Sequence, residues 1–294
     1  MDINFELYKI FYHAASSGSF SEAAKRLFIT QSAVSQSIAS LEDKTGCKLF
    51  IRKTRSIRLT QEGEVLMKHI EQAYNFIKTG EAKIKEIQNL EYGEIRIGVS
   101  DTVCRYFLLP VLQKFTAAYP NIKIRVINRT SPQIIDILKN GNVDLGIVTL
   151  PVDDKNINII KYTEAEDIFV AAARFEQLRG RKTNLRELSE YPLLLLQKDS
   201  ATRRNLDSFF EAQNISIVPE IELESIELLV EFARIGLGIA HVLKESAEAH
   251  INSGCLFRVD IAENMPKRTV GIALLKNMPY SQSTERLLEL MTKT

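Results

Sequence analysis

The chain has 294 residues, of which 45% are hydrophobic and 26% charged, with a formal net charge of +1. This length predicts at least two folded units, and no apolar run approaches the roughly 18 residues that cross a bilayer, so we expect no membrane partner. Residues 1–10 lack a basic stretch followed by an apolar one, which argues against secretion and predicts a cytoplasmic protein.

The spacing of cysteine and histidine argues against a metal site. Cys47, Cys104 and Cys255 lie far apart and form neither a disulfide framework nor a zinc-ligand pattern, and the four histidines show no ligand spacing. We therefore expect no metal and no cofactor. Cys104 is interpreted as a buried small hydrophobic residue rather than a redox sensor, because no second cysteine is near it in the sequence.

The small net charge hides an asymmetry along the chain. Residues 1–60 carry nine Lys or Arg against five Asp or Glu, a net of +4, whereas the remainder carries 29 basic and 32 acidic residues, a net of −3. Positive charge is therefore concentrated at the N-terminal end, where contact with nucleic acid would use it.

Two short helices are predicted at the N-terminus. Apolar residues repeat at helical spacing from Leu7 to Ala14, and this first helix should end near Gly18. Residues 19–22, Ser-Phe-Ser-Glu, fit a capping box that begins a second helix. Residues 28–29 are expected to form the turn that follows it.

A third helix is expected after Thr30, its N-cap, because Val34, Ile38 and Leu41 repeat at i, i+4 and i+7. The opposite face carries small and amide side chains, which would let the helix enter a major groove and let Gln pair with adenine. The alternative is an ordinary solvated helix face. The candidate DNA contacts of this segment are Thr30, Gln31, Ser32, Ser35 and Gln36.

Residues 48–58 hold five basic side chains and no acidic one, between apolar positions that suit strands. This pattern predicts a basic hairpin, the wing. Its cations would bind DNA phosphates or the minor groove, which is the sequence-independent part of binding. The candidate contacts of the wing are Arg52, Lys53 and Arg55.

These elements share one dense motif: Ser19-Phe20-x-x-Ala23-Ala24-x-x-Leu27-x-x-Thr30-Gln31-Ser32-x-x-Ser35-x-x-Ile38-x-x-Leu41-Glu42, followed by Gly46, Leu49-Phe50, Arg52 and Leu59-Thr60-x-x-Gly63. The motif resembles that of the LysR-type transcriptional regulators. The resemblance implies a mostly α winged helix-turn-helix over residues 1–60 that binds a dyad-symmetric operator in double-stranded DNA. RNA polymerase is then a candidate further partner.

Residues 61–90 are expected to form one long linker helix. Apolar or small residues recur with spacings of three and four, at positions 63, 66, 70, 73, 77, 80, 84 and 87, which is a heptad seam of the kind that pairs two helices. A homodimer follows from such a seam, and the alternative is a helix packed on its own domain. The resemblance implies that this helix is the dimerisation element of a homodimer or homotetramer.

The next segment alternates strands and helices. A helix with an internal Pro110 and a helix that opens at Ser131 separate three expected strands. This β-α-β-α-β order requires right-handed crossovers and a parallel sheet covered by helices. The three strands are placed at residues 94–99, 122–127 and 143–148.

A second run of strands is expected beyond residue 163, and the apolar segment 270–275 with a final helix at 283–291 should return to the first sheet. The two chain crossings would form a hinge between subdomains. This α/β architecture resembles periplasmic substrate-binding proteins and the effector domains of LysR-type regulators, a resemblance strengthened by the Gly-Leu-Gly-Ile-Ala stretch at 236–240. The second-run strands are placed at 168–172, 193–196 and 219–223, and the effector domain at 91–294, with subdomain I at about 91–162 and 266–294 and subdomain II at about 163–265.

Hydroxyl-rich segments follow several of these strands. In open parallel sheets, ligands bind beyond the carboxyl ends of the strands, where free amides at helix N-termini favour anionic groups. The alternative is that the hydroxyls only cap helices. The family resemblance implies contacts to sulfur metabolites or similar small anions at the serine and threonine positions. The candidate effector contacts are Ser100, Asp101, Thr102, Thr149, Ser200 and Thr202.

Two other classes of protein use a two-lobed fold. An enzyme would need more than Asp101 or Asp199, and the sequence has no Gly-x-Ser-x-Gly, P-loop or metal cluster. The solute-binding part of a transporter would carry a signal peptide. We therefore expect a transcriptional regulator and not an enzyme, controlled by a small anionic metabolite between the subdomains, with His241 as a packed core residue.

Overall fold

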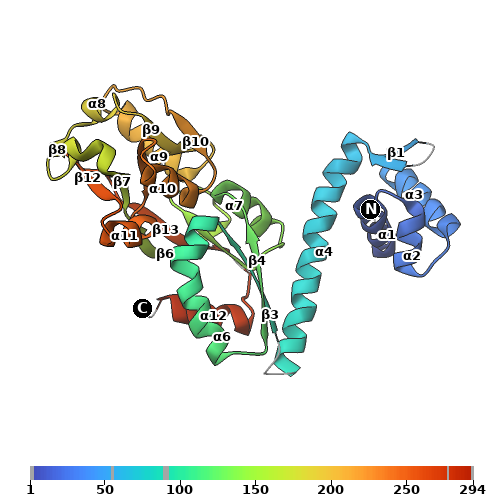
Figure 1. Ribbon diagram of the computed structural model, residues 1–294. Coiled ribbons are helices and arrows are strands. Elements are labelled where there is room, and N and C mark those ends of the chain that lie inside the picture. Colours follow the sequence, from blue (N-terminus) through green and yellow to red (C-terminus); the bar gives the residue numbers. More distant parts are fainter. Residues whose placement is uncertain (1–2, 54–55, 89–92, 277, 293–294) are drawn as a thin grey trace. The chain divides into compact units, whose positions relative to one another are not determined.

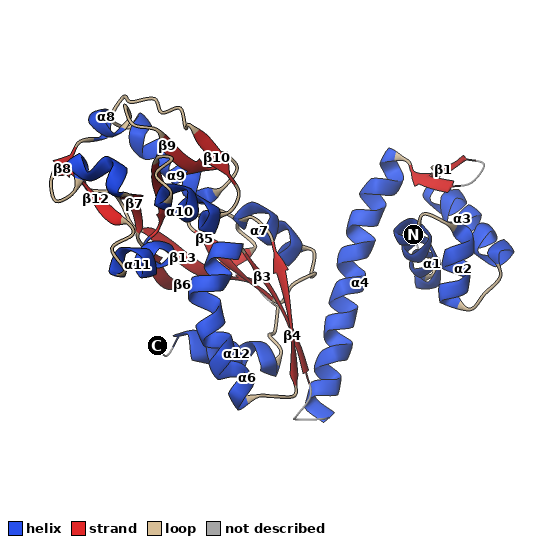
Figure 2. Ribbon diagram, in the orientation of Figure 1, coloured by secondary structure: helices blue, strands red, loops and turns tan. Residues whose placement is uncertain are grey.

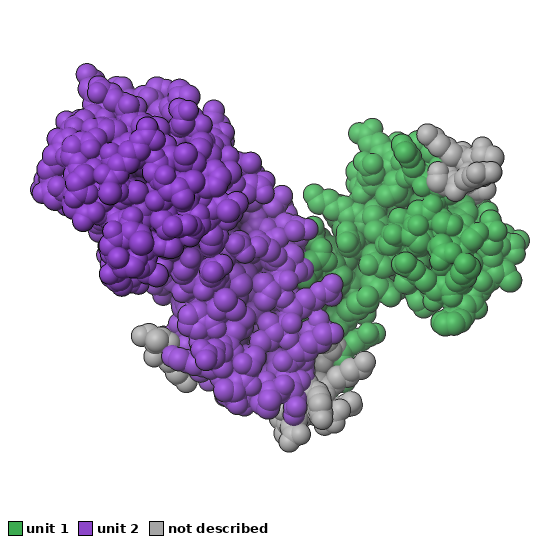
Figure 3. Space-filling model, viewed as in Figure 1, with its two compact units in different colours: residues 1–85, 139–142 green, residues 86–138, 143–294 purple. Residues whose placement is uncertain are grey.

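The computed structural model describes residues 3–53, 56–88, 93–276 and 278–292. The chain divides into two compact units, shown in green and purple in Figure 3. Unit 1 comprises residues 1–85 and 139–142, and unit 2 comprises residues 86–138 and 143–294. Within the described residues, no helix is long and apolar enough to cross a membrane.

Unit 1 begins with three helices, a two-stranded hairpin and a long helix, in the order that the sequence predicts (Figure 1). The first and third helices end at Gly18 and Gly46, both in the left-handed conformation that glycine adopts most easily. Phe11, Ile38 and Leu41 are fully buried between the helices. The elements are α1 (Phe5–Ser17), α2 (Phe20–Leu27), α3 (Gln31–Thr45), β1 (Phe50–Lys53), β2 (Ser56–Leu59) and α4 (Gln61–Gln88).

The N-terminal half of α4 packs on its own domain. A Cβ atom at Gly63 would lie 2.2 Å from the carbonyl oxygen of Leu49, so this glycine permits a close approach to the wing and does not belong to a seam between chains. Tyr74 packs on an aromatic ring of α1, with the ring centroids 4.5 Å apart. Ile77 and Ile84 are 44% and 58% exposed. Gly63 and Tyr74 therefore pack within unit 1, whereas Ile77 and Ile84, in the second half of the predicted seam, leave apolar side chains exposed.

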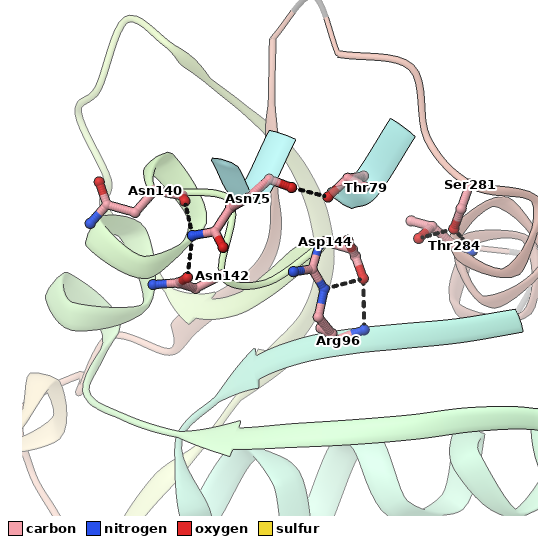
Figure 4. A network of polar contacts seen from close by, with 8 residues as sticks. All are labelled: Asn75, Thr79, Arg96, Asn140, Asn142, Asp144, Ser281 and Thr284. Carbon is pink, nitrogen blue, oxygen red and sulfur yellow. Dashed lines mark hydrogen bonds and ion pairs between the residues drawn. The ribbon is translucent and has the colours of Figure 1, made fainter. Parts of the chain in front are cut away.

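The short segment 139–142 belongs to unit 1 because side chains of α4 hold its backbone. Asn75 Nδ2 donates to the carbonyl oxygen of Asn140 at 2.9 Å and to Oδ1 of Asn142 at 2.6 Å (Figure 4). Gly141 has a φ of 69°, and a Cβ there would lie 3.2 Å from Asn75 Cβ. The positive φ therefore favours glycine here, and the side chains of Asn75 and Phe76 leave little space for a Cβ.

Unit 2 contains two sheets, each in its own subdomain (Figure 2). The first has the order β4-β3-β5-β13-β6, in which β3 pairs in parallel with β4 and β5, as predicted. The later strands β13 and β6 are antiparallel additions, so the sheet is mixed. Its strands are β3 (Gly93–Val99), β4 (Ile122–Asn128), β5 (Leu145–Thr149), β6 (Ile157–Ala165) and β13 (Arg268–Leu275), and its helices are α6 (Leu109–Ala118), α7 (Ser131–Lys139) and α12 (Gln282–Thr292).

The second sheet has the order β10-β9-β11-β7-β12-β8. Apolar side chains of α10 and α11 join a core that continues into the first subdomain, whereas α8 and α9 cover the other face with a separate core. The strands are β7 (Asp167–Ala171), β8 (Lys182–Thr183), β9 (Leu193–Leu196), β10 (Ile221–Leu223), β11 (Ile239–Leu243) and β12 (Phe257–Ile261), and the helices are η2 (Ala173–Leu178), α8 (Leu185–Leu188), α9 (Ala201–Glu211), α10 (Ile226–Arg234) and α11 (Lys244–Asn252).

The segment after β3 corrects one prediction. A single helix with an internal Pro110 was expected, but the chain forms α5 (Asp101–Val103), a π-helical turn η1 (Cys104–Leu108) and then α6. Pro110 lies in the first turn of α6. Proline has no N–H to donate and disrupts a helix interior, so it is tolerated where a new helical segment begins. The wider π turn makes this change of register.

The chain crosses between the subdomains twice, as predicted. It leaves the first sheet at the end of β6 and enters the second with β7, and it returns from β12 to β13. Asp167 is the first residue of β7, and Arg268 is the first residue of β13. Both crossings therefore end at a charged residue, and the two residues form a buried ion pair.

Candidate functional site

The exposed face of α3 carries the side chains that the sequence singled out for base contacts. Gln31, Ser32 and Gln36 are exposed and Ser35 is partly buried. Thr30 is the N-cap, because its Oγ1 accepts the backbone N–H of Ala33 at 3.2 Å. Its hydroxyl also lies 2.9 Å from Ser32 Oγ, so part of its bonding capacity serves the helix start rather than a ligand.

The wing is an antiparallel hairpin held to α3 by Glu42, a residue that the motif contained but that was not assigned a role. One carboxylate oxygen accepts the backbone N–H groups of Leu49 at 2.9 Å and Phe50 at 3.3 Å, and the other accepts Lys48 Nζ at 2.8 Å. Burial alone would raise the pKa of Glu42, but the hydrogen bonds from Lys48, Leu49 and Phe50 outweigh it and hold that pKa below its usual value. Glu42 therefore fixes where the wing begins.

The predicted wing contacts are only partly described. Arg55 lies outside the described residues. Arg52 and Lys53 lie in β1, where their backbones pair with Ile57 and Ser56, and their side chains are also outside the described part of the structure. Arg58, in β2, is exposed.

A cavity of about 800 Å³ in unit 2 contains all six predicted effector contacts: Ser100, Asp101, Thr102, Thr149, Ser200 and Thr202. Both subdomains line it, the first through the ends of β3 and β5 and the second through the end of β9 and the start of α9. Four helices, α5, α7, α9 and α10, begin at its wall. The structure thus brings together residues that the sequence proposed from three separate segments.

The hydroxyls at this cavity differ in their existing bonds. Ser200 Oγ accepts the backbone N–H of Arg203 at 3.1 Å, so Ser200 caps α9 as the alternative interpretation held. Ser100 precedes α5 but makes no side-chain cap hydrogen bond, which leaves its hydroxyl available. Thr149 and Thr202 are buried at the cavity wall.

Charged side chains of both signs line the same cavity. Asp101 Oδ1 accepts Asn128 Nδ2 at 3.2 Å, so the predicted contact Asp101 is already partly engaged. The cavity residues that sequence reasoning missed include Asn128, Arg129, Ser131, Gln197, Glu224, Ser225 and Arg268. Asn128 ends β4, Arg129 and Ser131 follow it, and Glu224 and Ser225 follow β10. The carboxyl-end rule, applied to every strand, would have found these five.

Cys104 and His241 were given non-catalytic roles from the sequence. Burial, followed by the charge of Asp101, raises the pKa of the Cys104 thiol, which disfavours the reactive thiolate. His241 is fully buried beside Phe169, with ring centroids 4.9 Å apart, as expected of a core residue. Its Nε2 has no hydrogen-bond partner among the described residues. No group of three potential metal ligands is present in the described part of the chain.

A winged helix joined to a two-lobed domain with a polar cavity defines the class of DNA-binding regulators that respond to a small molecule. Two family profiles match the chain: "Bacterial regulatory helix-turn-helix protein, lysR family" over residues 5–64, and "LysR substrate binding domain" over residues 88–294. The chain belongs to the LysR family. It is a DNA-binding transcriptional regulator with an effector-binding domain, and it is not an enzyme.

Named relatives agree with this family. The chain is 28% identical to the HTH-type transcriptional activator CmpR of Synechocystis sp. over 233 residues, which is 79% of this chain and 76% of CmpR. It is 25% identical to the HTH-type transcriptional regulator CfxR of Cupriavidus necator over 277 residues, which is 94% of this chain and 87% of CfxR.

Solved structures share the fold over the full chain. A full-length OxyR variant from Pseudomonas aeruginosa matches with a TM-score of 0.74 at 20% identity. The match covers 99% of this chain and 95% of the OxyR chain. CbnR in complex with its target DNA has a TM-score of 0.70 at 17% identity, with 99% of each chain covered. At these identities the likeness concerns the fold alone.

Proposed function

We propose that this LysR-family regulator is controlled by a small anionic metabolite held in the cavity between its two subdomains. The observation that carries this proposal is the convergence of four helix starts on one cavity. The N-terminal end of a helix carries partial positive charge and N–H groups without intrahelical partners. Three of these helices, α7, α9 and α10, are at least nine residues long.

The side chains at the cavity refine the kind of anion that fits. Arg129 and Arg268 add positive charge, and the hydroxyls of Ser100 and Thr102 can donate hydrogen bonds. Carboxylates line the cavity as well, at Asp101, Asp199 and Glu224. An effector that carries an oxyanion group and separate hydrogen-bond donors, such as a hydroxyl or amine, suits this mixture.

A thermal-shift screen of the full chain tests the proposal, with sulfate, thiosulfate, acetylserine and aromatic carboxylates as probes. A ligand present at 100 times its Kd should add about 2.7 kcal/mol to the unfolding free energy. Thr102→Val and Thr202→Val each remove one hydroxyl from the cavity and should weaken binding by about 1–2 kcal/mol. Thr116→Val, on α6 outside the cavity, is the matched control. Unchanged affinity in both cavity variants would mean that these hydroxyls do not contact the ligand.

For the DNA-binding side, we propose that Thr30, Gln31, Ser32, Ser35 and Gln36 read base edges, and that Arg52, Lys53 and Arg55 bind phosphates. Exposed isoleucines in the second half of α4 support pairing of two chains there. Two paired chains present two recognition helices, which suits a dyad-symmetric operator. The division into residues 1–60, 61–90 and 91–294, the homodimer or homotetramer, and contact with RNA polymerase are parts of the same proposal.

Binding measurements on two DNAs separate the two kinds of contact. Gln36→Ala should cost about 1–3 kcal/mol on the operator and little on random DNA. Arg52→Ala should weaken binding to both DNAs and flatten the salt dependence. Equal losses for both variants on both DNAs would contradict the assignment. Light scattering should give a mass of at least twice the 33.4 kDa of one chain.

A further inference from the structure

The wall of the cavity includes one buried cation whose hydrogen bonds are incomplete. Arg268 is 7% exposed and lines the cavity. Its Nε and Nη2 atoms donate to the two carboxylate oxygens of Asp167, and the Nη2 to Oδ1 distance is 2.6 Å. This bidentate pairing uses the edge of the guanidinium that carries Nε and Nη2. The Nη1 atom, on the opposite edge, does not bond to Asp167.

The Nη1 atom of Arg268 has one weak acceptor among the described residues. That acceptor is Thr149 Oγ1, at 3.5 Å, which is the outer limit of a hydrogen bond. Thr149 itself lines the cavity, so the incompletely bonded edge of the guanidinium lies at the cavity wall. A buried, charged donor without a good acceptor is costly, and an oxyanion in the cavity would supply the missing acceptor.

We propose that Arg268 binds one oxyanion group of the effector through Nη1 while its other edge holds Asp167. This inference rests on the anionic effector proposed above and identifies the residue that would receive its charge. Of the six contacts proposed from the sequence, five are hydroxyls and the other is the carboxylate Asp101. Arg268 adds a full positive charge to this set at a buried position.

The same guanidinium connects the ligand to the hinge. Asp167 begins β7 of the second subdomain and Arg268 begins β13 of the first, so their ion pair joins the two sheets beside both chain crossings. An oxyanion on Nη1 competes with Asp167 for one positive charge. Occupancy of the cavity therefore changes the strength of a bond across the hinge, which gives the effector a different affinity for different subdomain arrangements.

Sulfate binding to the full chain tests this inference, measured by calorimetry and by thermal shift against sodium chloride of equal ionic strength. Asp167→Asn keeps Arg268 and removes the competing negative charge, so it should bind sulfate several-fold more tightly and show a larger thermal shift than the unmodified chain. The double variant Asp167→Asn with Arg268→Gln keeps the site neutral and should bind at least about tenfold more weakly, because a charge-assisted bond is lost. If Arg268 only supported the fold, both variants would change the affinity for sulfate in the same direction.

The outcomes separate the two proposals. If Thr102→Val and Thr202→Val weaken sulfate binding but the Asp167 and Arg268 variants bind as the unmodified chain does, the cavity binds anions and the role of Arg268 is overturned. If the unmodified chain binds neither sulfate nor the other anions, both proposals fail. Circular dichroism checks that each variant folds. If the double variant does not fold, Asp167→Asn alone decides: tighter sulfate binding supports the role of Arg268, and unchanged binding overturns it.

Discussion

Two buried carboxylates support the two binding regions in different ways. Glu42, beneath the wing, accepts two backbone N–H groups, and its side-chain partner Lys48 is 78% exposed. Asp167, at the hinge, depends on Arg268, and both side chains are buried. Backbone amides are present whatever the side chains are, whereas a buried ion pair fails when either partner is lost. The start of the wing is thus held by backbone hydrogen bonds, and the hinge by an ion pair that a competing charge can alter.

The comparison of the two carboxylates predicts that the largest loss of stability follows from a substitution at the hinge. Arg268→Ala leaves the Asp167 carboxylate buried without its cation and should lower the unfolding free energy of unit 2 by about 3–5 kcal/mol. Arg258→Ala is the control, because Arg258 pairs at 2.8 Å with the neighbouring Glu166 but both side chains are more exposed, and it should cost less than about 1 kcal/mol. Urea unfolding, monitored by hydrogen exchange in β7 and β13, measures the stability loss in each of the two variants. Similar losses in the two variants would remove the distinction between them.

The next largest effect concerns pH and unit 2. Burial lowers the pKa of His241 to about 4, whereas an unfolded histidine titrates near 6.5. Between these values the unfolded chain binds a proton that the folded chain does not, so stability is full above pH 6.5 and falls as the pH approaches 4. The loss should be at most about 3 kcal/mol. His241→Leu should flatten this slope. A slope that survives in His241→Leu would place its origin elsewhere.

Unit 1 should respond to acid in a lower pH window. The pKa of Glu42 is held below its usual value, so its contribution is present above about pH 4.5 and is lost as the pH falls through the lowered folded value. Glu42→Gln keeps the shape but weakens the bonds to the amides of Leu49 and Phe50, at a cost of about 1–3 kcal/mol. Hydrogen exchange at those two amides should rise in the variant at pH 7. Unchanged protection there would mean that Glu42 does not hold the wing.

The same contrast explains which features the sequence could predict. In unit 1 the signals are local: helical spacing within α1 and α3, the Thr30 cap, and glycines at both helix ends. Each is decided by residues within a few positions of one another. The Glu42 bonds span only seven or eight positions, yet they were missed, because a carboxylate that accepts backbone amides leaves no pattern in the sequence.

In unit 2 the cavity was predictable in part, because the carboxyl ends of parallel strands meet at one edge. Within the first sheet that rule placed Ser100 and Thr149 together, whereas Ser200 follows a strand of the second sheet and was brought to the same cavity by the resemblance to two-lobed binding proteins. The rule could not pair Asp167 with Arg268, which are 101 positions apart, because only tertiary packing decides that contact. The strand β11 was also missed, since residues 236–240 were interpreted through a family motif and not as the start of a buried strand.

The smallest predicted change in stability concerns Lys48, at the start of the wing. Lys48 reaches Glu42 at 2.8 Å, but it is largely exposed, and an ion pair in contact with water contributes less than about 1 kcal/mol. Lys48→Ala should therefore leave the unfolding free energy of unit 1 nearly unchanged and keep the amides of Leu49 and Phe50 protected. Removing the lysine should nonetheless raise the pKa of Glu42, because the lysine side chain heads the interactions that lower it. Carboxyl titration by nuclear magnetic resonance measures that change. A stability loss as large as that of Glu42→Gln would show that the lysine, and not the backbone, supports the wing.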